Sequence, residues 1–266
     1  MSSPLAAALA LGAAHGLPVA EPVLLKDGSN LLVHLHPAPV VVRVATFTAF
    51  IRGEPAPFLE REVALGSYLA EVGAAVVPCS GELPPGPHHV SGWWMTAWQH
   101  VPHRVGVRPP ADQLLQSLVE LHGALAGYAG ELPLLGPATT DLDLALACCE
   151  QHGLLPATQV EHMLGERDAL LASVRSLPAT AQHGDAHPGN VLLTEQGVVW
   201  NDFEDCCLGS PLWDLATLAR HDQTGAVWAV ARDRFGGDLV EAMLGLRELQ
   251  VAAWTALHGA RAAGRL

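Results

Sequence analysis

The sequence changes its pattern near residue 111, and this change constrains the fold more than any other feature. Before it, short apolar runs separated by polar turns predict strands at Val23–Leu25, Leu31–Leu35, Val40–Val44, Val76-Val77 and Gly92–Trp98, with one amphipathic helix at Phe58–Glu71. After it, helical patterns dominate: Ala111–Ala126, Leu142–His152, Thr158–Leu171, Pro211–His221, Ala226–Phe235 and Leu239–His258. We therefore predict an α+β protein with a β-rich N-terminal lobe, residues 1–95, and a mainly helical C-terminal lobe, residues 96–266.

The composition limits the partners of this chain. It has 27 Asp and Glu residues against 14 Lys and Arg residues, a net charge of −13, and 50% of its residues are hydrophobic. Such an acidic chain repels phosphate backbones, so we expect no nucleic-acid partner. Five cysteines, including the neighbours Cys148-Cys149 and Cys206-Cys207, form no spaced disulfide framework and fit a reduced, cytoplasmic location. The uncharged N-terminal segment lacks the basic flank of a signal peptide and predicts a first helix, and we expect no membrane span.

The densest polar signal is the segment His183–Asn190, which precedes a predicted hairpin. The strands of this hairpin are Asn190–Thr194 and Val198–Asn201. A three-residue loop centred on Gln196 places Asn190 opposite Asp202, with Cβ atoms about 5 Å apart, unless a bulge shifts the register by one residue. An amide oxygen and a carboxylate this close suit Mg²⁺, which prefers one or two protein carboxylates together with phosphates and water.

Asp185 completes this group of side chains. It lies five residues before Asn190 in a loop that contains Gly and Pro, so its carboxylate can turn toward the same point. Phosphoryl transfer requires such a set, with a carboxylate that orients a hydroxyl and metal ligands that neutralise phosphate charge. The spacing Asp-x-x-x-x-Asn, followed by a hairpin and Asp-Phe, is also that of a protein-kinase catalytic centre.

This part of the chain resembles the aminoglycoside phosphotransferase family of small-molecule kinases. The resemblance rests on His-Gly-Asp-x-His-x-x-Asn at 183–190, Asp-Phe-Glu-Asp at 202–205 and Gly-Ser-Pro-Leu-Trp-Asp-Leu-Ala at 209–216. The N-terminal lobe matches more loosely. The resemblance implies a protein-kinase-like fold of two lobes that binds ATP in the cleft between them, with ATP and Mg²⁺ as cofactors. It also implies that Asp185 is the catalytic base, that Asn190 and Asp202 bind Mg²⁺, and that Asp214 braces the catalytic loop.

The resemblance also assigns the nucleotide contacts. Met95-Thr96-Ala97-Trp98 would be the hinge whose backbone meets adenine, through Met95, Thr96 and Trp98. Ser29 would lie in the turn that covers the phosphates. This turn, Asp27–Asn30, is shorter than a Gly-x-Gly-x-x-Gly loop, which the sequence lacks, so it offers few backbone amides.

One position departs from the usual pattern of kinases of this fold. Arg43 stands where a strand lysine is expected, and Glu62 on the following helix is its expected partner, with Glu60 as a less favoured choice. Arginine keeps the charge and can bridge phosphates through its fork, but it is bulkier than lysine. We therefore expect retained activity with an altered phosphate geometry.

Two other functions fit parts of the sequence. His183-x-Asp185-x-His187 resembles a fragment of a dinuclear metal-hydrolase motif, although this leaves the following hairpin unexplained. Arg43 and the missing Gly-rich loop would also suit a kinase-fold binding protein without turnover, against which the intact catalytic set argues.

The chemistry indicated by these motifs is transfer of the γ-phosphoryl group of ATP to a hydroxyl group of a small molecule, and we expect such an acceptor. Three segments expected to line its site contain more carboxylates than basic residues: Asp141–Glu150, Glu161–Asp168 and Glu204–Asp222. This balance and the resemblance favour a cationic amino sugar or amine alcohol, and antibiotic resistance is a further step of inference. Other branches of the family act on macrolides, choline, homoserine and sugars, and this sequence does not separate them.

Overall fold

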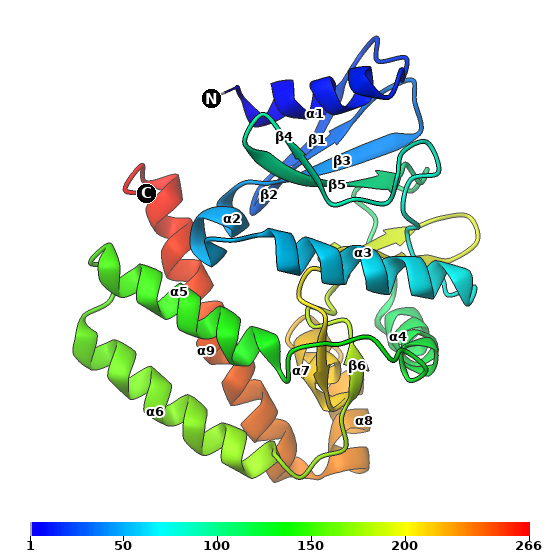
Figure 1. Ribbon diagram of the computed structural model, residues 1–266. Helices are drawn as coiled ribbons and strands as arrows, with labels where there is room; N and C mark the ends of the chain where they lie inside the picture. The colour runs from blue at the N-terminus through cyan, green and yellow to red at the C-terminus, as the bar shows by residue number, and fades with distance from the viewer. Residues whose placement is uncertain (1) are drawn as a thin grey trace. The chain divides into compact units, whose positions relative to one another are not determined.

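The computed structural model describes residues 2–266, which divide into two compact units (Figure 1). The first unit runs to Arg108 and also includes Val191–Glu204, whereas the second comprises Pro109–Asn190 and Asp205–Leu266. This grouping differs from the predicted division after residue 95. The strand that contains residue 95 continues to Gln99, and the segment 191–204 joins the first unit, where Trp200 bridges to Val76.

The first unit is built on an antiparallel sheet of order β1-β2-β3-β5-β4. Its strands are β1 (Val23–Asp27), β2 (Asn30–His34), β3 (Val40–Ala45), β4 (His88–Val90) and β5 (Trp93–Gln99). Its helices are α1 (Pro4–Ala14), α2 (Phe47–Arg52) and α3 (Ala56–Glu71). Helix α1 begins at a favourable cap, because the Ser3 side chain accepts from the N–H of Ala6 and Pro4 occupies the first helical position.

Alternation along the strands gives this sheet two different faces. Val40, Val42 and Val44 of β3 point into an apolar core that includes Ala7, Ala8 and Leu11 of α1. Because successive strand residues point to opposite faces, Arg43 lies on the other side of the sheet. Figure 1 shows α1 on one side of the sheet and α3 on the other, where Gly66 of α3 meets the Trp98 ring.

The hairpin predicted after Asn190 is present in the first unit, with a register different from the expected one. Strands β7 (Val191–Leu193) and β8 (Val198–Trp200) pair Val191 with Trp200 and Leu193 with Val198. The loop therefore has four residues rather than three, because Thr194 closes the turn by bonding to Gly197. The one-residue shift leaves Asn190 one position before the first pair and Asp202 two positions after it.

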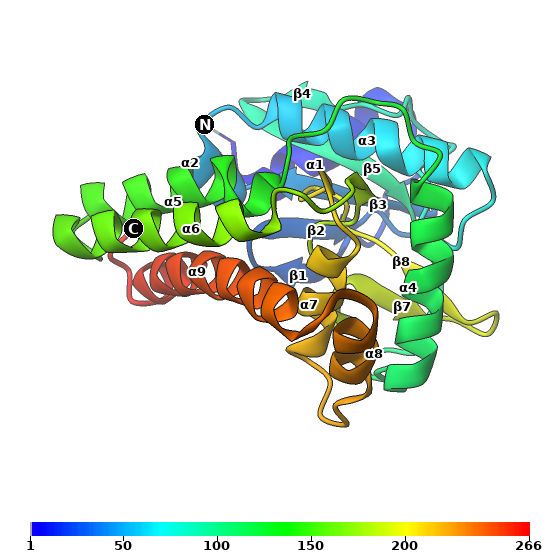
Figure 2. The ribbon, with the colours of Figure 1, turned by 90° about the horizontal axis from the view of Figure 1, so that it is seen from below.

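The second unit is mainly helical. Its elements are α4 (Ala111–Leu125), η1 (Gly136–Ala138), α5 (Thr140–Gln151), α6 (Ala157–Val174), β6 (Thr180–Gln182), η2 (Pro188–Asn190), β9 (Cys207–Gly209), α7 (Leu212–Ala219), α8 (Ala226–Phe235) and α9 (Gly237–Ala262). Helices α5, α6 and α9 lie side by side (Figure 2), and α9 also packs on α7. Strands β6 and β9 pair antiparallel, next to the predicted catalytic loop. Among residues 2–266, no helix combines the length and apolar character that a membrane crossing requires.

Candidate functional site

The first unit contains a cavity on the sheet face opposite α1. Its empty volume is about 660 Å³, part of it open to solvent. The apolar lining comprises Leu25, Leu32, Val41, Val77, Trp98, Val101 and Leu192. The polar lining comprises Arg43, Glu62, Gln99, His100, His103, Asn201 and Asp202. A cavity with apolar walls and charged groups suits a flat base that carries an anionic tail.

The chain segment that lines this cavity comes later than the hinge predicted from the sequence. Met95 is buried in the core on the α1 face, and Thr96 is also buried, where its hydroxyl accepts from the indole of Trp98. Of the predicted hinge contacts, Trp98 alone belongs to the lining, followed by Gln99–Val101. The prediction placed the hinge too early because β5 continues to Gln99, where its backbone is still paired with β3.

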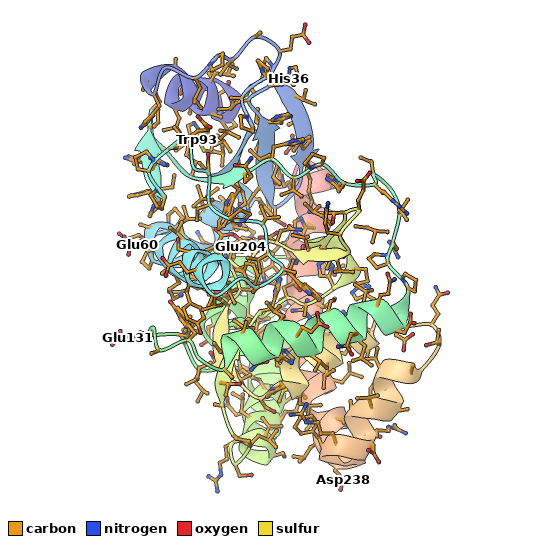
Figure 3. All side chains as sticks on the ribbon, turned by 90° about the vertical axis from the view of Figure 1, so that its right-hand side faces the viewer. His36, Glu60, Trp93, Glu131, Glu204 and Asp238 are labelled. Carbon is orange, nitrogen blue, oxygen red and sulfur yellow. The ribbon has the colours of Figure 1, made fainter. Side chains whose placement is uncertain are left out.

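Arg43 is the charged centre of the cavity. It is 3% exposed, and one terminal nitrogen pairs with Glu62 on α3. The other terminal nitrogen bonds the carboxylates of Asp202 at 3.1 Å and Glu204 at 2.7 Å. The predicted pairing of Arg43 with Glu62 is therefore present. Glu60 is exposed instead, as Figure 3 shows on the outer side of α3.

This cluster combines Arg43 with three carboxyl groups. Burial raises the pKa of Glu62 to about 8, opposed by Arg43 and assisted by the nearby carboxylates of Asp202 and Glu204. Although burial acts against the charged guanidinium, the three carboxylates hold the pKa of Arg43 above its ordinary value. Because Glu62 holds its proton up to about pH 8 and Arg52 also pairs with Glu204, the cluster carries no excess of negative charge at neutral pH.

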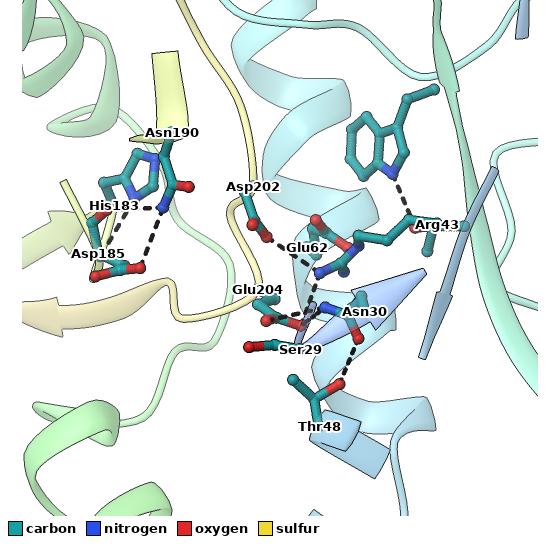
Figure 4. A network of polar contacts seen from close by, with 12 residues as sticks. Ser29, Asn30, Arg43, Thr48, Glu62, His183, Asp185, Asn190, Asp202 and Glu204 are labelled. Atoms are coloured by element: carbon teal, nitrogen blue, oxygen red, sulfur yellow. Dashed lines mark hydrogen bonds and ion pairs between the residues drawn. The ribbon is translucent and has the colours of Figure 1, made fainter. Parts of the chain in front are cut away.

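Sequence reasoning missed the role of Glu204 in this cluster. Glu204 accepts from Asn30 at 3.1 Å and pairs with Arg52 of α2 at 3.4 Å, in addition to Arg43 (Figure 4). The Asn30 oxygen in turn accepts from the Thr48 hydroxyl at 2.6 Å. Despite burial, Arg43 and Arg52 lower the pKa of Glu204, so it stays ionised. Glu204 lies two residues after Asp202 in the Asp-Phe-Glu-Asp motif at 202–205, and this position was the signal that could have identified it.

Ser29 lies outside the cavity lining. Its carbonyl accepts from the backbone N–H groups of Phe47 and Thr48, which ties the β1–β2 turn to the start of α2. The neighbouring Asn30 is buried and bonds Glu204, so this turn is anchored at two adjacent residues. A phosphate-covering role for Ser29 stays a prediction.

Asp202 has an unusual backbone in the first unit. Its φ of 67° lies in the left-handed region, which aspartate tolerates better than most residues. The turn begins two residues after β8 ends and directs the carboxylate to the cavity lining, where the side chain is 27% exposed. Strained backbone at a charged, partly open position is typical of functional residues.

The second unit holds the predicted catalytic loop, which is attached to α7 through Asp214. The buried carboxylate of Asp214 accepts from the backbone N–H groups of His183 and Gly184, both at 2.9 Å, and contacts His122 Nε2 at 3.0 Å. The Trp213 indole donates to the Gly184 carbonyl at 2.7 Å. These contacts match the bracing role that the family resemblance implies for Asp214.

Gly184 is required by the path of the loop. Its φ is +90°, and a Cβ atom there would lie 1.8 Å from the carbonyl oxygen of Asp205. A side chain would therefore push the loop away from the chain that leads into β9. The Gly in His-Gly-Asp thus lets the loop approach its neighbour closely.

Asp185 and Asn190 lie together in this loop (Figure 4). The Asn190 amide nitrogen donates to the Asp185 carbonyl at 3.0 Å and to its carboxylate at 3.1 Å. Both bonds use the amide nitrogen of Asn190 and leave its amide oxygen out of this pair of contacts. His183 is buried, and its Nδ1 accepts from the N–H of Asp185 at 3.2 Å, so this histidine shapes the loop.

A second basic residue that the sequence did not reveal contacts Asp185. Arg247 of α9 pairs with the Asp185 carboxylate, and His187 Nε2 lies 3.2 Å from its other oxygen. Burial raises the pKa of Asp185, but Arg247 and His187 outweigh it and hold that pKa well below its usual range. Because Arg247 lies 62 positions along the chain from Asp185, no local pattern connects the two.

The zinc-hydrolase alternative finds no support in this loop. His183 Nδ1 and His187 Nδ1 both accept backbone N–H groups, from Asp185 and Gly189. Within residues 2–266, no group of three or more His, Cys, Asp or Glu side chains is placed to hold a metal ion.

Comparison with solved structures places the fold among small-molecule kinases. Amicoumacin kinase, in complex with AMP-PNP, Ca²⁺ and its ligand, is 14% identical, with a TM-score of 0.67, over 94% of this chain and 85% of the other. Aminoglycoside 2'-phosphotransferase IIIa with GDP is 15% identical, with a TM-score of 0.65, over 98% and 93%. Choline kinase LicA from Streptococcus pneumoniae is 14% identical, with a TM-score of 0.64, over 97% and 92%.

The sequence itself is also characteristic of a family. No curated protein matches the chain in a sequence search. The model of the Phosphotransferase enzyme family, however, matches residues 23–249, which span the sheet, the cavity, the catalytic loop and Arg247. The α+β architecture agrees with this match and with the protein-kinase-like fold predicted from the motifs. The chain therefore belongs to the phosphotransferase enzyme family and is a small-molecule phosphotransferase.

Proposed function

We propose that the protein transfers the γ-phosphoryl group of ATP to a hydroxyl group of a small molecule. The acceptor oxygen forms a bond to the γ-phosphorus, the bond to the bridging oxygen of ADP breaks, and the hydroxyl proton passes to the Asp185 carboxylate. The main support is the catalytic loop, in which Asp214 fixes the backbone and Asn190 bonds the Asp185 carboxylate. Such positioning is most of what phosphoryl transfer asks of a protein.

The cavity of the first unit is the proposed nucleotide site. Its walls include Leu32, Val41 and Leu192, which offer apolar surface to a purine. Gln99 and His100 donate their backbone N–H groups to Pro78 and Pro39. The N–H of Val101 has no acceptor among the described residues, so we assign the backbone contact with adenine to Val101.

Arg43 and two oxygen ligands would serve the phosphates. Arg43 would bind phosphate oxygens through its fork, with Glu62 holding the guanidinium in place. Asn190 and Asp202 would hold Mg²⁺, which when bound neutralises charge on the β- and γ-phosphates.

The acceptor class needs direct measurement. A cationic amino sugar follows from the acidic composition, and the names of two solved relatives point to an aminoglycoside and to choline. The test measures release of the nucleoside diphosphate, ADP from ATP or GDP from GTP. It is run across aminoglycosides, macrolides, amino alcohols, sugars and hydroxy acids. Turnover of any acceptor that depends on ATP and Mg²⁺ supports the proposal.

The controls separate transfer from binding. Asp185→Asn should abolish transfer, whereas Asp233→Asn, the same chemical change at an exposed position of α8, should not alter it. Nucleotide binding without transfer to any acceptor would instead favour a kinase-fold binding protein. Hydrolysis that needs zinc and persists without nucleotide would contradict both.

A further inference from the structure

Apart from the neutral amide of Asn190, the side chains that contact the Asp185 carboxylate in the second unit are basic. Arg247 pairs with one oxygen of the Asp185 carboxylate, and His187 lies 3.2 Å from the other. The ring of His221 is 5.3 Å from that of His187. Burial and the positive charges of His187, Arg220 and Arg247 lower the pKa of His221. A cationic acceptor group next to the reacting hydroxyl would meet these like charges.

The carboxylates that suggested a cationic acceptor are engaged elsewhere in this unit. Asp143 and Asp168 both pair with Arg167. Asp222 accepts from the N–H groups of Thr224 and Val227 at the start of α8.

Other acidic residues of the predicted segments are also committed. Asp141 is 3% exposed, and the buried Asp214 binds the catalytic loop. Glu204 belongs to the Arg43 cluster of the first unit. The engaged residues named in this and the preceding paragraph are most of the carboxylates in the three segments. The excess of carboxylates over basic residues in these segments is therefore weak support for a cationic acceptor.

Arg247 is built into the second unit as a preformed anion-binding group. It is 6% exposed, its guanidinium lies 5.8 Å from the Trp213 ring, and one terminal nitrogen donates to the buried Gln250. Its Nε is buried and has no hydrogen-bond partner among the described residues. Burying an arginine is costly unless its charge is paired. Here the partner is Asp185, the residue that must accept the proton of the acceptor.

This pairing creates a conflict that an anionic substrate would resolve. While Arg247 holds the Asp185 carboxylate, that oxygen is less available to a hydroxyl group. A carboxylate on the acceptor matches the planar fork of arginine and can replace Asp185 as the partner of Arg247. The freed Asp185 oxygen can then accept from the hydroxyl.

We propose that Arg247 binds a carboxylate group of the acceptor, and that the acceptor is a short hydroxy acid. This inference rests on the proposed function and deepens it. Arg247 and Asp185 are in direct contact, so the acceptor carboxylate and the reacting hydroxyl must be separated by only a few bonds. Arg247 is then a specificity-determining residue, and Gln250 is the residue that orients it.

The test compares matched acceptors in the full-length wild-type enzyme. The probes are hydroxy acids of two to five carbons, their carboxamides, the amino alcohols of equal length, and glycerol phosphate as a phosphate-bearing alcohol. We expect kcat/KM for the best hydroxy acid to exceed that for its carboxamide by about 10- to 100-fold, since a hydrogen bond between charged groups is lost. Preference for the amino alcohols, or for glycerol phosphate over every hydroxy acid, would overturn the proposal.

Arg247 variants identify the residue responsible. Arg247→Gln should reduce the ratio of hydroxy acid to carboxamide toward one, and Arg247→Lys should restore part of it. This ratio does not depend on the folded fraction of the variant. Arg232→Gln, at an exposed arginine of α8, is the control and should leave the ratio unchanged.

The outcomes also separate this inference from the proposed function. Two results with Arg247→Gln would refute the proposal: an unchanged ratio of kcat/KM for the hydroxy acid and its carboxamide, or an equal loss of activity with all acceptors and in ATP hydrolysis. Either result would assign Arg247 to the structure of the loop or to the transferred phosphoryl group. Transfer to the amino alcohols alone, on their hydroxyl groups, would refute this proposal while leaving the phosphotransferase function intact. Absence of transfer to every acceptor, with no thermal stabilisation by ATP, would overturn both.

Discussion

Replacing Arg43 by lysine tests whether the cavity depends on a guanidinium fork or only on a positive charge. Arg43 uses one terminal nitrogen for Glu62 and the other for Asp202 and Glu204. Lysine ends in a single nitrogen, which cannot reach both sides of this cluster. At least one buried carboxylate would therefore lose its partner in Arg43→Lys.

The structure sets the expected size of the effect. The side chains of Glu62 and Glu204 are 1% and 12% exposed, so water screens these pairs weakly. Losing one hydrogen bond to a charged group costs about 1.5–3 kcal/mol. For a chain of this length, about 2 kcal/mol corresponds to a fall in Tm of about 4–8 °C. We also expect kcat/KM for ATP to fall about tenfold, because the fork no longer bridges phosphate oxygens.

The assay is a double-mutant cycle with Glu62→Gln, read out by thermal unfolding without nucleotide and by steady-state kinetics. In the Glu62→Gln background, lysine has to serve only Asp202 and Glu204, so the cost of Arg43→Lys should shrink by about 1–3 kcal/mol. Arg108→Lys, at an exposed position of the same unit, is the matched control. Equal stability and equal kinetics for wild type and Arg43→Lys would refute the argument.

Three further outcomes follow from the catalytic loop. Asp185→Asn is expected to lower kcat by about 10²- to 10⁴-fold with nucleotide Kd within about twofold, measured by ADP release and calorimetry, and a retained kcat would remove Asp185 from the chemistry. Gly184→Ala should cost more than about 3 kcal/mol in urea unfolding, because its Cβ would collide with the Asp205 carbonyl, whereas Gly153→Ala, at φ +64° with open space, should cost about 1 kcal/mol. Burial raises the pKa of Asp214, but His122 and the loop backbone outweigh this and lower that pKa below its ordinary value of 3.8. The ionised Asp214 carboxylate therefore stabilises the folded protein fully above about pH 4, and this stabilisation is lost as the pH falls through the lower pKa of the folded state. Asp214→Asn should therefore cost about 2–4 kcal/mol at pH 7 and progressively less below about pH 4, and a difference independent of pH would contradict this assignment.

Most of the longer elements could be predicted from local patterns. The helix expected at Ala226–Phe235 has those bounds, and the helix predicted at Leu239–His258 runs from Gly237 to Ala262. The short strands β4, β6 and β9 and the six-residue helix α2 were missed. Three residues are too few to display a periodicity, and such strands depend on the partner that supplies their hydrogen bonds.

The residues of the candidate site also fall into those that local sequence patterns predicted and those that depend on distant partners. Asp185, Asn190 and Asp202 were chosen because their spacing within one continuous segment is that of a phosphoryl-transfer motif, and their catalytic and metal-binding roles stay predictions. The pairing of Arg43 with Glu62 was expected from the pattern of kinases of this fold, and it is present in the structure.

Residues that depend on distant partners were beyond the reach of local patterns. The cavity lining by Gln99–Val101 and the pairing of Arg247 with Asp185 were apparent only from the folded chain. Periodicity and motif spacing act over a few residues, whereas the charge around a buried group is the sum of all side chains that packing brings within a few ångströms of it. Motif spacing along the chain thus identifies the family, and three-dimensional packing decides which charged side chains surround Asp185.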